Sequence, residues 1–290
     1  MRARSRRIAQ DIDSLAELPP LSPMVAQLTA TLNSDAVDFR DVEAIIRRDP
    51  VIAARVIGAA NTVAYAGHAP TASIHTAVLR LGVLAVRRLA FLLSLYNAVP
   101  GPRAERQGFW RHSLAVAHAA EVIAGQAPIW SAAVYPDQAF IAALLHDLGL
   151  LALARHHARE DALVASVASE KRLARWRVER DVLGIDHAQI GARLAAHWSF
   201  PEAVTTVIAF HHDFASAPTE ARWLAAVIAL GDALCNEDEM AGMGEGAYVG
   251  TIEESIALLG LAPDALGQIV DQTRCDAARD LAVLEAIGGY

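Results

Sequence analysis

This chain of 290 residues has few cysteines, few aromatic side chains and no excess of positive charge. Cys235 and Cys275 are its only cysteines, which excludes a disulfide framework and predicts a reducing compartment. Residues 8–20 contain three acidic side chains where a secretory signal would need an apolar run. The longest apolar stretches, 141–154 and 224–234, are each interrupted by Asp and are shorter than a membrane span. We therefore expect a cytoplasmic protein without a membrane partner.

The balance of charge disfavours nucleic acid as a partner. The chain has 25 basic and 33 acidic residues and a formal net charge of −8, whereas binding along a phosphate backbone needs clustered Lys and Arg. We interpret the one basic cluster, the four arginines within residues 2–7, as a solvated tail. A helix–Gly–helix piece at Leu81–Val83 resembles a helix-turn-helix, but such pairs are common in any helical domain.

Strand signals are nearly absent, because aromatic residues make up only 6% of the chain and no run alternates apolar and polar side chains. Helical spacing recurs instead. Asp49 followed by Pro50 predicts the start of a helix, and Ser73 can cap another helix that ends at Gly82. The sequence therefore predicts an all-α protein.

Two helical lobes, 1–98 and 109–290, are the natural division of the chain. They are separated by Asn97–Gly108, a segment with two Pro and two Gly that we predict to be a linker. Helices of the second lobe are predicted near residues 109–126, 137–156, 187–198, 201–212, 218–236, 251–259 and 263–286.

An imidazole and a carboxylate, His146 and Asp147, interrupt an otherwise apolar predicted helix. Burying such a pair is unfavourable by several kcal/mol unless hydrogen bonds or a cation compensate. His112 lies 34 residues upstream on a predicted neighbouring helix, and Asp232 is a lone carboxylate in a third apolar helix. Each could be a hydrogen-bonded core residue. Together the four predict a shared site for Mn, Fe, Zn or, with more oxygen ligands, Mg.

Further histidines follow in the second lobe. His187 opens the segment 186–194, and His211 and His212 end the helix predicted to begin at Pro201. For the His211–His212 pair the alternative is C-terminal helix capping, because imidazolium is favoured at the negative end of the helix dipole.

The order of short motifs over residues 20–235 resembles the HDOD family, the HD-related output domains of bacterial signalling proteins. The matching pieces are Leu18–Ser22, Asp49–Ala53, Ala59–Thr62, Ile74–Gly82, Phe109–Ser113, Leu144–Gly149, His187–Leu194, Trp198–Pro201 and the pair His211–His212. The resemblance implies an HD-domain-like helical fold with an N-terminal helical lobe packed on it.

The same resemblance implies which residues would hold metal. The H…HD…D set of the HD phosphohydrolases would fall on His112, His146, Asp147 and Asp232. The second-metal positions of the related HD-GYP phosphodiesterases would fall on His187, His211 and His212.

Three positions depart from the enzymes of this superfamily. Leu150 stands where HD-GYP enzymes have a phosphate-binding Lys, no Gly-Tyr-Pro follows His212, and Gly108 replaces a Glu ligand of some trinuclear relatives. Since phosphoryl transfer depends on positioning and charge neutralisation, we expect a regulatory output module. It would act through a signalling protein partner, with a retained metal site and little or no catalysis. The alternative is a metal-dependent phosphodiesterase or phosphohydrolase acting on a nucleotide, such as a cyclic di-nucleotide.

Overall fold

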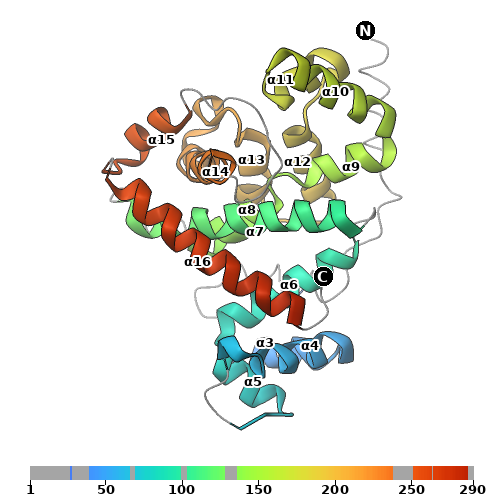
Figure 1. Ribbon diagram of the computed structural model, residues 1–290, viewed down its shortest axis with the longest axis vertical. Helices are drawn as coiled ribbons and strands as arrows, with labels where there is room; N and C mark the ends of the chain where they lie inside the picture. Colours follow the sequence, from blue (N-terminus) through green and yellow to red (C-terminus); the bar gives the residue numbers. More distant parts are fainter. Residues whose placement is uncertain are drawn as a thin grey trace. The chain divides into compact units, whose positions relative to one another are not determined.

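A computed structural model of the chain describes residues 27, 39–65, 69–98, 103–127, 136–237, 251–262 and 264–286. These residues form helices joined by turns and contain no strand, so the predicted all-α fold is confirmed (Figure 1). The chain divides into two compact units. One contains Gly108–Cys275, and the other contains Pro19–Gln107 together with Asp276–Tyr290. The basic cluster within residues 2–7 lies outside the described residues.

The unit that contains Pro19–Gln107 is built from short helices that pack against one another. They are α3 (Phe39–Ile46), α4 (Pro50–Ala60), the 3-10 turn η2 (Val63–Tyr65), α5 (Ile74–Leu81) and α6 (Val83–Ala98). Both predicted helix starts are confirmed. Asp49 Oδ1 accepts hydrogen bonds from the backbone N–H groups of Val51 and Ile52, at 2.9 and 3.1 Å. Ser73 Oγ accepts one from the N–H of Thr76.

The unit that contains Gly108–Cys275 holds most of the remaining helices. They are α7 (Arg103–Gln126), α8 (Pro136–Leu145), α9 (Leu148–His156), α10 (Ala158–Lys171), α11 (Arg175–Leu183), α12 (His187–His197), α13 (Glu202–Phe210), the 3-10 turn η3 (Phe214–Ser216), α14 (Thr219–Glu237), α15 (Thr251–Leu259) and α16 (Ala265–Ala286). Helix α12 packs closely on both α9 and α13. The helix α16 contributes residues to both units, because the boundary falls after Cys275.

The stretch Gln138–His156 is long and apolar enough to span a membrane by length and composition alone, and 78% of it is buried within the protein. It includes α9 and most of α8. Its apolar side chains therefore belong to the protein core, as is usual for central helices of a packed helical domain.

Two predictions about helix boundaries are wrong, and two helices are missing from the prediction. The helix predicted over 137–156 is interrupted at His146 and Asp147, which form a turn between α8 and α9. The predicted linker Asn97–Gly108 is helical at both ends, and its remaining residues, 99–102, are outside the described part. Its Pro residues are confined to that short stretch, and Gly108 is uncrowded inside a helix. Helices α10 and α11 were not predicted, because their sequences are strongly charged and few of their apolar side chains are buried.

Candidate metal centre

All seven histidine and aspartate residues singled out in the sequence converge on one region of the larger unit. Different segments contribute them: α7 carries His112, the α8–α9 turn carries His146 and Asp147, α12 begins with His187, His211 and His212 follow α13, and α14 carries Asp232. All are buried except His212, which is partly exposed. Chemistry-bearing residues from five places in the sequence thus meet inside an otherwise apolar core.

The first group consists of His112, His146, Asp147 and Asp232. His112 Nε2 lies 3.1 Å from Asp232 Oδ1 and 3.6 Å from Asp147 Oδ2. His146 Nε2 lies 3.2 Å from Asp147 Oδ2 and 3.8 Å from Asp232 Oδ1. Two imidazole nitrogens and two carboxylate oxygens therefore face one another, in the combination that the sequence predicted.

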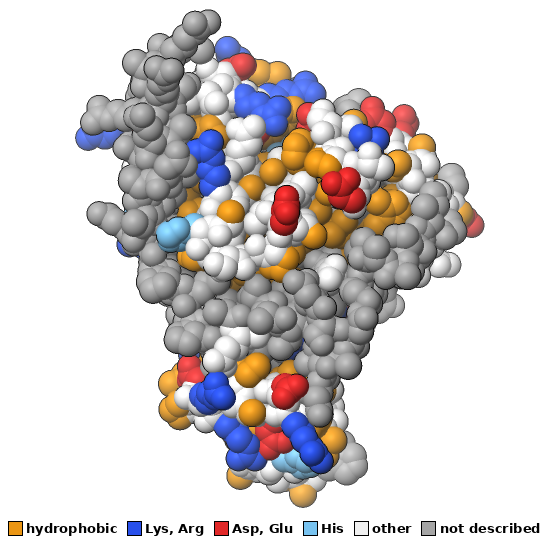
Figure 2. All heavy atoms as spheres, turned by 180° about the vertical axis from the view of Figure 1, so that it is seen from behind, with side chains coloured by type: hydrophobic (Ala, Val, Ile, Leu, Met, Phe, Trp, Pro, Cys, Tyr) orange, Lys and Arg blue, Asp and Glu red, His pale blue; other side chains and the backbone are white. Residues whose placement is uncertain are grey.

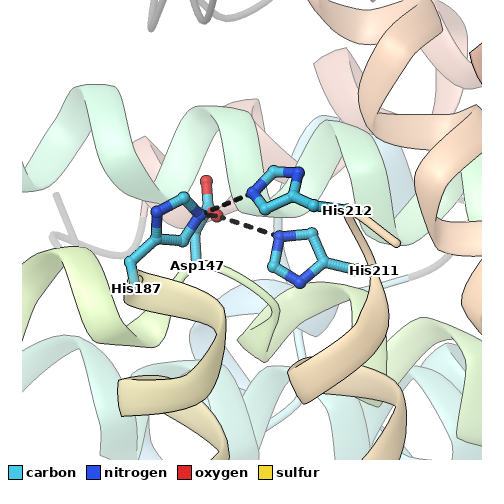
Figure 3. A group of neighbouring side chains, drawn as sticks. All are labelled: Asp147, His187, His211 and His212. Carbon is cyan, nitrogen blue, oxygen red and sulfur yellow. Dashed lines mark hydrogen bonds and ion pairs between the residues drawn. The ribbon is translucent and has the colours of Figure 1, made fainter. Parts of the chain in front are cut away.

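The second group consists of Asp147, His187, His211 and His212 (Figure 3). Asp147 Oδ1 lies 3.2 Å from His187 Nε2 and 3.7 Å from His211 Nε2. The Nε2 atoms of His187 and His212 are 2.7 Å apart. Asp147 thus belongs to both groups, since its Oδ2 atom faces the first and its Oδ1 atom faces the second. A carboxylate placed in this way can bridge two ions.

Two histidines are held by the ends of the helices that they follow. His146 Nδ1 lies 2.6 Å from the carbonyl oxygen of Ala143, and His211 Nδ1 lies 2.7 Å from that of Ile208. A carbonyl can only accept, so both rings carry a proton on Nδ1 and direct Nε2 toward the cluster. The capping alternative considered for His211 is therefore correct for one nitrogen of its ring and leaves the other free to bind.

Three buried polar atoms at the centre of the cluster make no hydrogen bond within the described structure. They are His146 Nε2, Asp147 Oδ1 and His211 Nε2. Buried polar atoms are nearly always satisfied in folded proteins, and exceptions point to an ion, a water or a functional role. Here each such atom is a potential metal ligand that faces other ligands.

The pKa values of the cluster indicate that its buried carboxylates are ionised and need a positive charge beside them. Burial lowers the pKa of His146, but the charge of Asp147 and the contact with it prevail and raise this pKa to about 10. Burial raises the pKa of Asp232, yet His112 and His146 bring it below its ordinary value. The pKa of Asp147 is lowered in the same way, mainly by His146. Both buried carboxylates therefore stay ionised and require a positive neighbour, which is either a proton on His146 or a cation.

The two glycines Gly149 and Gly191 allow the helices that carry the ligands to approach closely. A Cβ atom on Gly149 would lie 2.0 Å from the carbonyl oxygen of His187, and one on Gly191 would lie 3.1 Å from the backbone nitrogen of Gly149. Helices α9 and α12 therefore touch at these residues. This contact brings Asp147, at the start of α9, within reach of His187, at the start of α12.

Comparison with known proteins identifies the family. The model of the HDOD domain matches residues 18–214, which is more than half of the chain. The chain belongs to the HDOD family. The family resemblance inferred from the order of motifs is thereby confirmed.

Solved HDOD-like structures share the fold over nearly the whole chain. A crystal structure of an HDOD domain protein of unknown function from Geobacter sulfurreducens is 26% identical, with a TM-score of 0.77, and the alignment covers 98% of this chain and 97% of that one. A candidate signal transduction protein from Marinobacter aquaeolei VT8 is 26% identical, with a TM-score of 0.81, over 94% of this chain and 60% of that one. An uncharacterized protein of Treponema pallidum is 22% identical over 79% of this chain, but this chain spans only 44% of its length.

The HDOD chain differs from HD-type phosphodiesterases where the sequence indicated. Leu150 is buried in α9, so an apolar side chain occupies the position at which those enzymes have a phosphate-binding Lys. After His212 the chain forms the short turn η3 (Phe214–Ser216), with no Gly-Tyr-Pro.

The described surface on the face drawn in Figure 2 has basic, acidic and apolar side chains interspersed.

Sequence reasoning missed the residues that support the ligands of this HDOD centre. Glu179 is fully buried in α11, and its Oε2 atom lies 2.6 Å from His187 Nδ1. Asn236 donates a hydrogen bond from Nδ2 to Asp232 Oδ1, at 2.8 Å. Asn236 could have been found, because it stands one helical turn after Asp232. Glu179 lies in a helix that was not predicted, so only the tertiary structure reveals its role.

Proposed function

We propose that this HDOD chain is a regulatory module of bacterial signal transduction that retains an HD-type metal centre and has little or no hydrolase activity. Membership of the HDOD family and similarity to a candidate signal transduction protein support the signalling role. The module would act in the cytoplasm through a signalling protein partner. A nucleotide remains a possible ligand of the centre in this proposal, and nucleic acid is not a proposed partner.

The observation that carries the metal part of the proposal is the set of unsatisfied ligand atoms at the centre of the cluster. His146 Nε2, Asp147 Oδ1 and His211 Nε2 are buried without a hydrogen bond among the described residues. Divalent cations bound at the two ligand groups would satisfy all three atoms and neutralise the two buried carboxylates. Because imidazole nitrogens outnumber carboxylates, Mn, Fe or Zn suits the set better than Mg.

Two ions fit the arrangement of the ligands. His112, His146, Asp147 and Asp232 would hold the first, and His187, His211 and His212 would hold the second together with Asp147. When bound, such ions would supply Lewis acidity and charge neutralisation. The residues of the chain would fix the positions of the ions, keep the imidazole lone pairs directed inward and exclude bulk water.

Weak catalysis follows from what the surroundings of the cluster provide. A phosphodiester transition state concentrates negative charge, and loss of one well-placed donor typically lowers the rate about 10²–10³-fold. Leu150 occupies the position of the phosphate-binding Lys and is buried. Of the seven proposed ligands, only His212 is more than marginally exposed, which restricts access of a substrate to the ions.

The second candidate function is a metal-dependent phosphodiesterase or phosphohydrolase acting on a nucleotide. The observation that favours it is the convergence of both ligand groups on a shared Asp147, as a two-ion hydrolase would require.

Metal analysis followed by a hydrolysis assay distinguishes the two functions. The purified protein is loaded separately with Mn, Fe and Mg and is tested on cyclic di-GMP, with a His146→Ala variant as the control for contaminating activity. We expect about two ions per chain and no measurable turnover. A rate near ~1 s⁻¹, which is ordinary for an enzyme, that disappears in the control would establish the hydrolase instead. Binding of a signalling partner that survives His146→Ala would support the module.

A further inference from the structure

Helix α11 (Arg175–Leu183) contacts the second ligand group directly with two side chains and its flanking residue Asp186 with a third. Glu179 reaches His187, Trp176 stacks on His212, and Arg180 pairs with Asp186 directly before His187. His187 and His212 are two of the three histidines of that group. Two of the three histidines of the second group therefore depend on contacts with one short helix, while His211 is held by the end of α13.

The contact between Glu179 and His187 is the most specific of the three. Glu179 Oε2 lies 2.6 Å from Nδ1 and 2.7 Å from the backbone nitrogen of His187. An ionised carboxylate only accepts, so the His187 ring carries its proton on Nδ1. Its Nε2 lone pair then faces Asp147 Oδ1, at 3.2 Å.

The other carboxylate oxygen of Glu179, Oε1, is also bound by a side chain. Arg175 Nε donates to Glu179 Oε1 at 3.0 Å, and the same guanidinium is paired with Asp161 of α10. Arg175 thus links the two helices of the hairpin and compensates the buried charge of Glu179. An uninterrupted chain of charged contacts runs from Asp161 to His187.

The partly exposed ligand His212 is held by stacking. Its ring lies against the indole of Trp176, with ring centroids 5.7 Å apart and planes 12° from parallel. The guanidinium of Arg180 covers the same indole, with its Cζ atom 4.7 Å from the ring centroid. Arg180 also pairs with Asp186, whose side chain caps α12.

The first ligand group is supported from elsewhere. His146 is held by the carbonyl oxygen of Ala143, and Asp232 accepts a hydrogen bond from Asn236. These partners lie on α8 and α14. The two groups therefore have separate supports, although they share Asp147.

We propose that Glu179 is a positioning residue that determines the occupancy of the second ion site without controlling the first. This inference rests on the metal centre of the proposed function. A carboxylate behind a ligating imidazole fixes its tautomer and orientation, and loss of such a group typically weakens metal binding about 10–100-fold. The α10–α11 hairpin is then the part of the module through which the number of bound ions can change.

The test compares Glu179→Ala and Glu179→Gln with Asp181→Asn, which changes an exposed carboxylate on the same helix. Titration calorimetry with Mn²⁺ gives the two affinities, and elemental analysis gives the stoichiometry. We expect Glu179→Ala to weaken the second ion about 10–100-fold and to leave the first nearly unchanged. Glu179→Gln keeps an oxygen that accepts from the His187 ring, so it should restore part of the affinity even if the Ala variant folds poorly. Asp181→Asn should behave as wild type.

A ¹⁵N NMR spectrum of the histidine side chains gives a measurement that a purely structural role would not affect. The His187 ring should carry its proton on Nδ1 in the wild type and in Glu179→Gln, and should lose this preference in Glu179→Ala. Two ions bound by Glu179→Ala with wild-type affinities would refute the role of Glu179 and leave the metal centre intact. Equal loss of both ions from the folded Gln variant would refute the selectivity. If the wild type binds no ion, the metal centre and this inference fail together.

Discussion

Replacing Gly149 by Ala should disrupt both the packing and the ligand geometry of this HDOD protein, although Ala is ordinarily the better helix former. Gly149 lies in α9, and a Cβ atom there would stand 2.0 Å from the carbonyl oxygen of His187 and 2.8 Å from the backbone nitrogen of Gly191. Ordinary carbon–oxygen contacts begin at about 3.3 Å. Helices α9 and α12 would therefore have to separate by roughly 1 Å.

The magnitude follows from the nature of the clash. Overpacking a core is unfavourable by ~1–3 kcal/mol, and the upper end applies because backbone atoms cannot turn aside as a side chain can. The higher helix propensity of Ala offsets ~1 kcal/mol of this destabilisation. We expect a net loss of about 2 kcal/mol in the free energy of unfolding. The same displacement would move Asp147 away from His187, which is now 3.2 Å distant, and should release the second ion.

Urea denaturation and metal analysis measure the two effects separately. Gly125→Ala is the matched control, because Gly125 is also helical but a Cβ atom there would meet nothing within 4 Å. This control should be neutral or stabilising by up to ~1 kcal/mol and should keep its metal. A Gly149→Ala protein with wild-type stability and metal content would refute the argument from close approach.

The remaining predictions concern pH and one ligand. Against the lowering effect of burial, Asp147 raises the pKa of His146 to about 10. An ion at the first group must displace that proton, so its affinity, measured by calorimetric titration, should rise about tenfold per pH unit between pH 6 and 8. An affinity that does not change with pH would contradict this. Burial lowers the pKa values of His211 and His212, and histidine contacts lower that of Asp232. Stability from these lowered pKa values is lost as pH falls, so denaturation of the chelator-treated protein should show weakening below about pH 6.5 and further below about pH 4. Stability that increases as the pH falls below about 6.5 would contradict this. His212→Ala should lower the metal content without unfolding the protein, whereas unchanged content would exclude His212 as a ligand.

The residues of the candidate metal centre could be predicted because they violate the pattern around them. His146, Asp147 and Asp232 are polar residues in apolar segments, and all three lie in the core. Burial without compensation is too unfavourable to persist, so each position had to have a partner or an ion. The composition of the segments therefore contained the information, and the order of the motifs added the rest.

Glu179 could not be predicted in the same way. It lies among the charges of α11, beside Arg175, Arg177 and Arg180, where a carboxylate is ordinarily solvated. Its burial depends on the packing of α11 against α12, which no local pattern encodes. The helices α10 and α11 were missed for the same reason, since their apolar stripes are narrow. The residues that support the second group therefore lie in α11, a segment whose sequence pattern does not indicate a buried helix.

The break between α8 and α9 shows why the continuous helix was the wrong expectation. In an uninterrupted helix, the carbonyl groups of the last turn of α8 would accept from backbone N–H groups four residues later. Because the helix ends at Leu145, the carbonyl of Ala143 accepts from both the backbone N–H and the ring Nδ1 of His146. At the end of α13, the carbonyl of Ile208 likewise accepts from the ring Nδ1 of His211.

Helix capping and metal ligation are alternative explanations for a histidine at a helix end. They are compatible, because the two nitrogens of an imidazole point in different directions. At His146 and His211, Nδ1 donates to a carbonyl of the helix that ends there, while Nε2 faces the cluster. Each helix end thereby determines which nitrogen is available and where its lone pair points. A helix that ends beside a buried carboxylate can thus orient a histidine before any ion binds. The polar residues that interrupt the apolar helices mark these helix ends, and they therefore predicted the candidate site better than the helical periodicity did.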